Sequence, residues 1–112
     1  MTTLRFVALV ALTGLMACGS SAATSTPQRH EVAMDGMQFV PADLTVNQGD
    51  TVVWINKDIV PHTSTDSSAT AGGWDSGMVN AGDSAVVVMG TKGSFDYVCI
   101  FHPVMTGKIV VQ

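Results

Sequence analysis

Basic residues are scarce in this sequence. Of its 112 residues, five are Lys or Arg and nine are Asp or Glu, so the net charge is −4 at pH 7. Proteins that bind nucleic acid carry a basic patch or stripe, and no Lys- or Arg-rich run occurs here. The composition therefore argues against a nucleic-acid partner, and it favours a cationic protein partner met by electrostatic steering.

Long hydrophobic runs are also absent, except for Phe6–Ala17 near the start of the chain. This run follows a basic residue, Arg5, and is too short to span a bilayer comfortably. Such a pattern is typical of a secretory signal peptide, which we expect at residues 1–17. The protein is therefore expected to be exported, to the periplasm or to the outer face of a cell membrane.

The run ends in "LMAC", which resembles the lipobox of bacterial lipoproteins. That resemblance implies that Cys18 receives lipid and becomes the new N-terminus; the alternative is ordinary cleavage near Ala22 or Ala23. The small, uncharged residues that follow cannot form a core, so we expect a flexible tether at 18–29 and one folded domain at 30–112.

Cysteine is nearly absent as well, with two residues in the whole chain. If Cys18 carries lipid, only Cys99 remains in the domain, and a disulfide is excluded. A domain this small benefits from some other staple, and a single bound metal could supply it.

Helical periodicity is missing after residue 17. Short β-branched runs instead alternate with Gly, Asn and Asp turns, which predicts an all-β sandwich or barrel. The strand-like segments are "HEVAM", "DLTVNQGDTVVWIN", "DSAVVVM", "SFDYVC" and "GKIVVQ", and "STDSSATAGGWDSG" is expected to be a loop with a short edge strand.

The residues that carry chemistry lie in "YVCIFHPVM", where Cys99, His102 and Met105 recur at a three-residue step. A fourth candidate, His62, lies in another loop 37 residues before Cys99. Two imidazoles, one thiolate and one thioether form the donor set of blue-copper electron-transfer sites. Each of these residues alone would more often be core or surface packing, but together they predict a site for one copper ion.

The other candidate donors do not join this set. His30 has no companion ligand nearby and is interpreted as a solvated residue at a strand end. Met34, Met37, Met78 and Met89 are spread along the chain, which favours core and edge packing over a methionine-rich copper-storage surface.

The segment "VPHTS … DYVCIFHPVMTGKIVV" resembles the cupredoxins, in particular plastocyanin- and amicyanin-like blue copper proteins. The resemblance covers Glu31 to Gln112 and is specific in the C-x2-H-x2-M loop. It implies a Greek-key β-sandwich with the metal in loops at one end. His62, Cys99 and His102 would be the strong ligands, and Met105 the weak axial one. Thr63 stands where the family commonly has Asn, and it is expected to join the two ligand loops.

These residues predict a monomeric one-electron carrier between redox proteins, with no enzymatic activity. The alternative is a module that delivers copper to another protein. A trinuclear copper centre needs many histidines, and the chain has three. A dinuclear copper centre of the cytochrome-oxidase type needs two cysteines in its loop, and this loop has one. An enzymatic copper centre is therefore not expected. The expected docking surface is apolar and surrounds His102: Val60, Pro61, Phe101, Pro103 and Val104.

Overall fold

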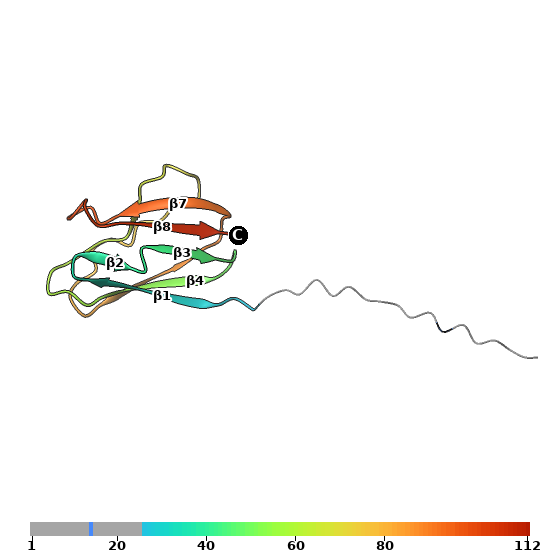
Figure 1. The fold of residues 1–112 in the computed structure, drawn as a ribbon, viewed down its shortest axis with the longest axis horizontal. Helices are drawn as coiled ribbons and strands as arrows, with labels where there is room; N and C mark the ends of the chain where they lie inside the picture. The colour runs from blue at the N-terminus through green and yellow to red at the C-terminus, as the bar shows by residue number, and fades with distance from the viewer. Residues whose placement is uncertain (1–13, 15–25) are drawn as a thin grey trace, which may run out of the picture.

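A computed structural model describes Gly14 and residues 26–112 of the chain (Figure 1). Apart from Gly14, the expected signal peptide lies outside the described residues, as does the expected lipid site at Cys18. The first strand begins at Arg29. Among the described residues, no helix is long and apolar enough to cross a membrane.

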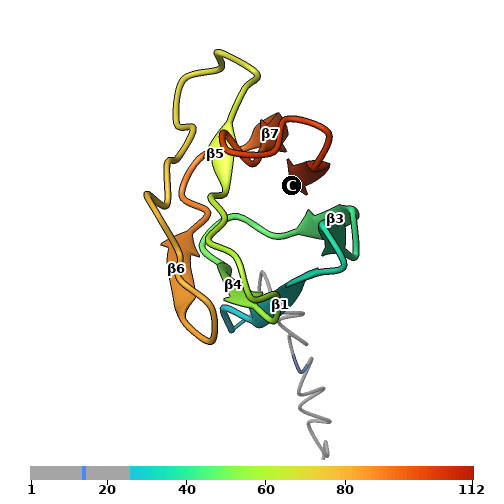
Figure 2. The ribbon, with the colours of Figure 1, turned by 90° about the vertical axis from the view of Figure 1, so that its left-hand side faces the viewer.

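Residues 26–112 form eight β-strands in two four-stranded sheets (Figures 1 and 2). One sheet has the order β2-β1-β4-β6 and the other the order β3-β8-β7-β5. The strands are β1 (Arg29–Asp35), β2 (Gln38–Val40), β3 (Asp43–Val46), β4 (Thr51–Asn56), β5 (Thr65–Asp66), β6 (Ser84–Val88), β7 (Gly93–Val98) and β8 (Thr106–Val111).

The chain passes from one sheet to the other at every connection between β2 and β7. As a result, β1 pairs with β4 in parallel, and β3 pairs with β8 in parallel, while the remaining pairs are antiparallel. This arrangement confirms the predicted all-β Greek-key sandwich. The five strand-like segments of the sequence all lie in strands, and the expected edge strand is β5.

Strand β2 was not predicted from the sequence. It follows a tight turn at Gly36 and Met37, whose φ angles are +62° and +60°. Both values lie in the left-handed region, which favours glycine. Because the second position is a methionine, the sequence gives no clear signal of this turn.

The core lies between the sheets and is built by the alternation of each strand. On β7 the inward side chains are Phe95 and Tyr97, which are 1% and 0% exposed. The alternation continues past the end of β7 to Cys99, whose side chain is also fully buried. The thiol of Cys99 therefore enters the end of the hydrophobic core rather than the solvent.

The two ends of the sandwich carry different parts of the chain. At one end, here called the site end, lie the connections 57–64 and 99–105, which follow β4 and β7. At the opposite end, the backbone amide of Thr51 donates to the carbonyl of Gln28, and the amide of Gln48 donates to the carbonyl of Gln112. The start and the end of the domain thus lie together, away from the site end (Figure 1).

Candidate metal centre

His62 is placed by the connection that follows β4. Its backbone exchanges two hydrogen bonds with Val79, with N···O distances of 3.1 and 2.8 Å, which fix this short connection against the segment before β6. The imidazole is fully buried. Its Nδ1 atom lies 3.7 Å from the Sγ atom of Cys99.

The loop 99–105 is closed by its own backbone. The amide of Cys99 donates to the carbonyl of Met105, and the amide of Met105 donates to the carbonyl of His102, at 3.1 and 2.8 Å. The amide of His102 donates in turn to the carbonyl of Cys99 at 3.2 Å. Each three-residue step is therefore a hydrogen-bonded turn, which explains how so short a spacing returns to the same point.

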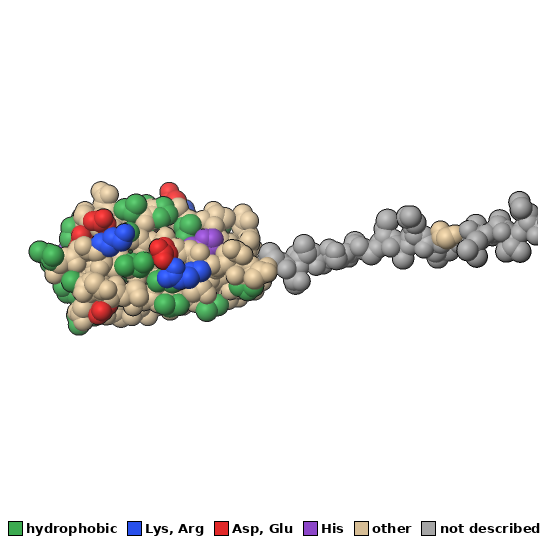
Figure 3. Space-filling model, turned by 90° about the horizontal axis from the view of Figure 1, so that it is seen from below, with side chains coloured by type: hydrophobic (Ala, Val, Ile, Leu, Met, Phe, Trp, Pro, Cys, Tyr) green, Lys and Arg blue, Asp and Glu red, His purple; other side chains and the backbone are tan. Residues whose placement is uncertain are grey.

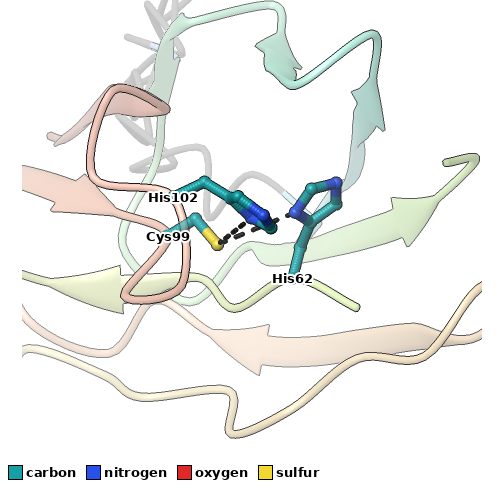
Figure 4. Close-up of side chains that lie close together, drawn as sticks. All are labelled: His62, Cys99 and His102. Atoms are coloured by element: carbon teal, nitrogen blue, oxygen red, sulfur yellow. Dashed lines mark hydrogen bonds between the residues drawn. The ribbon is translucent and has the colours of Figure 1, made fainter. Parts of the chain in front are cut away.

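His62, Cys99 and His102 form one cluster, with ligand atoms that all lie within 4.8 Å of one another (Figure 4). The Nδ1 atom of His102 is also 3.7 Å from Cys99 Sγ. The two imidazole rings are inclined at 74°, with their centroids 5.1 Å apart. Both rings thus direct Nδ1 at the same sulfur, and His102 is the partly exposed member of the three.

The separation of the sulfur from each of the two nitrogens fits one metal ion bound by all three residues. With metal–sulfur and metal–nitrogen lengths of about 2.3 and 2.0 Å, as found for zinc, a trigonal angle separates S and N by about 3.7 Å and a tetrahedral angle by about 3.5 Å. The observed separation is 3.7 Å for both imidazoles. A soft thiolate together with two imidazoles is a donor set that would suit copper.

Thr63 contacts the sulfur, and Met105 lies buried at the end of the ligand loop. Met105 is buried, with 1% of its surface exposed, at the end of the ligand loop. The backbone amide of Thr63 donates to Cys99 Sγ at 3.3 Å, and its Oγ1 accepts from the amide of Ile100 at 2.9 Å. Thr63 is therefore the residue through which the two loops are joined.

One residue of the site was missed in the sequence. Asp58 places its Oδ2 atom 2.8 Å from Nε2 of His62. Burial alone would raise the pKa of Asp58, but hydrogen bonds from the Met37 amide, His62 and the Gly36 amide outweigh it and hold the pKa below its ordinary value. The one available signal was an acidic residue four positions before the histidine in a short connection.

His30 does not match its interpretation as a solvated strand-end residue. Its Nε2 atom lies 2.9 Å from Oδ2 of Asp50, a buried carboxylate that also accepts from the amides of Gln28 and Asn47. These residues lie at the end of the domain opposite the site. His30 therefore belongs to a structural network and not to the candidate metal centre.

Apolar side chains are exposed on the two connections that carry His62 and His102. Val104 is 85% and Phe101 is 47% exposed, Pro61 and Pro103 are exposed, and Val60 is partly buried. Ile59, from the same connection as His62, is 95% exposed and was not expected in this set. Figure 3 shows hydrophobic side chains at this end of the domain, away from the start of the described chain.

Comparison with known proteins agrees with this geometry. The profile of the family described as "Copper binding proteins, plastocyanin/azurin family" matches residues 27–112. Amicyanin of Paracoccus versutus is 28% identical over 72% of this chain and 63% of its own length. Amicyanin-alpha of Methylorubrum extorquens is 30% identical over 73% of this chain and 71% of its own length. The aligned region thus spans less than two thirds of the first of these relatives.

Solved structures give the same result. A mutant of amicyanin in the Cu(I) state superposes with a TM-score of 0.70 at 29% identity, over 75% of this chain and 82% of that one. An oxidized amicyanin mutant gives a TM-score of 0.70 at 30% identity, with the same coverage. Copper is thereby confirmed as the cofactor, and the cluster of His62, Cys99 and His102 could hold one ion. This chain belongs to the plastocyanin/azurin family of copper-binding proteins.

Proposed function

We propose that this protein is an exported one-electron carrier with a mononuclear copper site. The observation that carries the proposal is the equal 3.7 Å separation of both imidazole Nδ1 atoms from Cys99 Sγ. Copper, when bound, would supply a one-electron change between Cu(II) and Cu(I). His62, Cys99 and His102 would be its strong ligands and Met105 its weak axial ligand.

The chain's own contribution is rigidity. The ligand loop is closed by three backbone hydrogen bonds, and Thr63 ties it to the connection that carries His62. The ligands are therefore held in place before an electron arrives, so little has to move during transfer. Burial of His62, Cys99 and Met105 also keeps water from the sulfur.

His102 is the proposed point of electron exchange, because it is the ligand that reaches the surface. The docking surface around it consists of Val60, Pro61, Phe101, Pro103 and Val104. An exposed apolar patch of this kind commonly marks a partner site. We propose that this surface receives redox proteins as donor and acceptor, and that the protein itself is a monomer.

The rival function, delivery of copper to another protein, needs an open site from which the ion can exchange. The buried ligands and the hydrogen-bonded loop favour electron transfer instead. An enzymatic role is not proposed. The chain's three histidines cannot build a trinuclear copper centre, and the single cysteine of the ligand loop cannot build a dinuclear one.

The decisive experiment is the visible spectrum of the protein loaded with Cu(II). We expect an intense blue colour from charge transfer with the Cys99 thiolate, lost in Cys99→Ser. The matched control is His30→Ala, which removes the one histidine outside the cluster and should keep the colour. A colourless Cu(II) protein, or colour retained in Cys99→Ser, would refute the proposal. Rapid loss of copper to a chelator would favour the delivery function.

A further inference from the structure

The fully buried imidazole of His62 meets a carboxylate on the side away from Cys99. Nε2 of His62 and Oδ2 of Asp58 are 2.8 Å apart, and the Asp58 side chain is 15% exposed. The same ring turns Nδ1 toward the sulfur at 3.7 Å. A neutral imidazole carries one proton on its two nitrogens, and a carboxylate accepts but does not donate. The proton therefore belongs on Nε2, and Nδ1 is left with its lone pair toward the sulfur.

Asp58 is itself held in one orientation. The amide of Gly36 donates to Oδ1 at 2.8 Å, and the amide of Met37 donates to Oδ2 at 3.0 Å. Both amides come from the left-handed turn between β1 and β2, which directs two successive N–H groups at one carboxylate. The backbone amide of Asp58 donates to Oδ1 of Asn56 at 2.9 Å. The carboxylate cannot swing away from His62 without losing the bonds from the Gly36 and Met37 amides.

From this geometry we propose that Asp58 is a positioning residue that selects the ligating tautomer of His62 and favours Cu(II) over Cu(I). The electrostatic part rests on the proposed copper function, whereas the tautomer part does not. A carboxylate on the far nitrogen makes a ligating imidazole more basic, which strengthens its bond to the more highly charged ion. The β1–β2 turn thereby acts on the metal site through one side chain.

A simpler reading is that Asp58 only closes the turn. In that case the contact with His62 gives the Asp58 charge no special effect, and removing any carboxylate at the same end of the domain would change copper binding equally. Asp35 provides the comparison, since it is exposed, ends β1 and lies one residue before Gly36. Asp35→Asn removes the same charge without touching His62.

The first test uses the metal-free wild-type protein at neutral pH. Nitrogen-15 NMR of the histidine rings should show His62 with its proton on Nε2. A proton on Nδ1 would overturn the proposal whatever the metal does. Because no copper is involved, this result stays readable even if the blue site proves wrong.

The second test is the reduction potential of Asp58→Asn against Asp35→Asn, after an amide NMR spectrum has verified the fold of each. Loss of the Asp58 charge should lower the preference for Cu(II) over Cu(I) about tenfold, a rise of about 59 mV for one electron. Asp35→Asn should move the potential far less. Equal shifts in the two variants would overturn the electrostatic part. A protein with no blue site would instead refute the proposed function and leave the tautomer result standing.

Discussion

The backbone amide of Thr63 points at Sγ of Cys99 across 3.3 Å, although the two residues are 36 positions apart in the chain. The Oγ1 atom of the same threonine accepts the amide proton of Ile100 at 2.9 Å. One buried residue thus holds the thiolate and the residue after it. The hydrogen bond from the Thr63 amide can be made by any residue with a backbone N–H. The hydrogen bond to Thr63 Oγ1 needs a side-chain hydroxyl.

Thr63→Val should therefore destabilise the metal-free protein by about 1–3 kcal/mol, because the Ile100 amide and the Thr65 hydroxyl both lose Thr63 Oγ1 as their acceptor. Urea unfolding measures the change. Thr63→Ser is the matched control, since it keeps the hydroxyl, and it should unfold close to wild type. If the valine variant is as stable as the serine variant, the tie between the loops contributes nothing.

Gly107 on β8 lies against the ring of Tyr97. A Cβ added at this glycine would come within 2.4–2.5 Å of the tyrosine ring and hydroxyl, and Tyr97 is fully buried. Gly107→Ala should cost about 1–3 kcal/mol through overpacking. At Gly90 an added Cβ meets nothing within 4 Å, so Gly90→Ala is the control. Thermal unfolding of the two variants should differ clearly, and equal melting temperatures would contradict the packing described here.

Asp50 predicts how the domain responds to acid. Hydrogen bonds from the Gln28 amide, the His30 ring and the Asn47 amide lower the pKa of Asp50 from 3.8 to about 2. Because the folded pKa lies below the unfolded value, this carboxylate stabilises the fold above about pH 4. That contribution is lost as the pH falls from about 4 to about 2.

The measurement is the free energy of unfolding of the metal-free protein between pH 2 and 6. Asp50→Asn should be less stable than wild type near pH 6, and the difference should shrink toward pH 2. His30→Ala should show part of the same effect, since it removes one of the three donors. A constant gap between wild type and Asp50→Asn across this range would show that the charge is not involved.

The proposed docking surface makes a prediction about rates. Val104 is 85% exposed beside His102, so Val104→Asp should weaken apolar docking while leaving the ligands untouched. We expect the second-order rate of electron transfer to the partner to fall about tenfold, equivalent to about 1.4 kcal/mol of docking free energy. Val86, which is 64% exposed on β6, provides the control. If Val86→Asp slows transfer as much as Val104→Asp, the patch is not the docking surface.

Membrane attachment should depend on Cys18, which lies outside the described residues. Cys18→Ala should move the protein from the membrane fraction to the soluble fraction, because stable anchoring takes covalent lipid. Cys99→Ala changes the only other cysteine and should stay with the membrane. Detection of the Cys18→Ala protein in the membrane fraction would rule out the lipid anchor.

The sequence predicted those parts of the protein that depend on neighbours along the chain. Strands appear as β-branched alternation, and Cys99, His102 and Met105 share one loop with an even step. His62 could be added because its residue type completes a known donor set. Asp58 and the pairing of His30 with Asp50 could not be found this way. The parallel pairing of β1 with β4 brings His30 to Asp50 and the Gly36 and Met37 amides to Asp58, and no local pattern records which strand lies beside which. The His62–Asp58 contact is local, but an acidic residue four positions before a histidine is too common to signal it.

The placement of Gln28 and Gln112 at the end opposite the ligand loops has a consequence for how the protein meets others. Gln28 and Gln112 both lie at the end of the domain away from the site end (Figure 1). If the proposed lipid anchor holds the chain through residues before Gln28, we expect the site end to face away from the membrane. We expect a proposed redox partner to reach the site end without competing for space with that anchor.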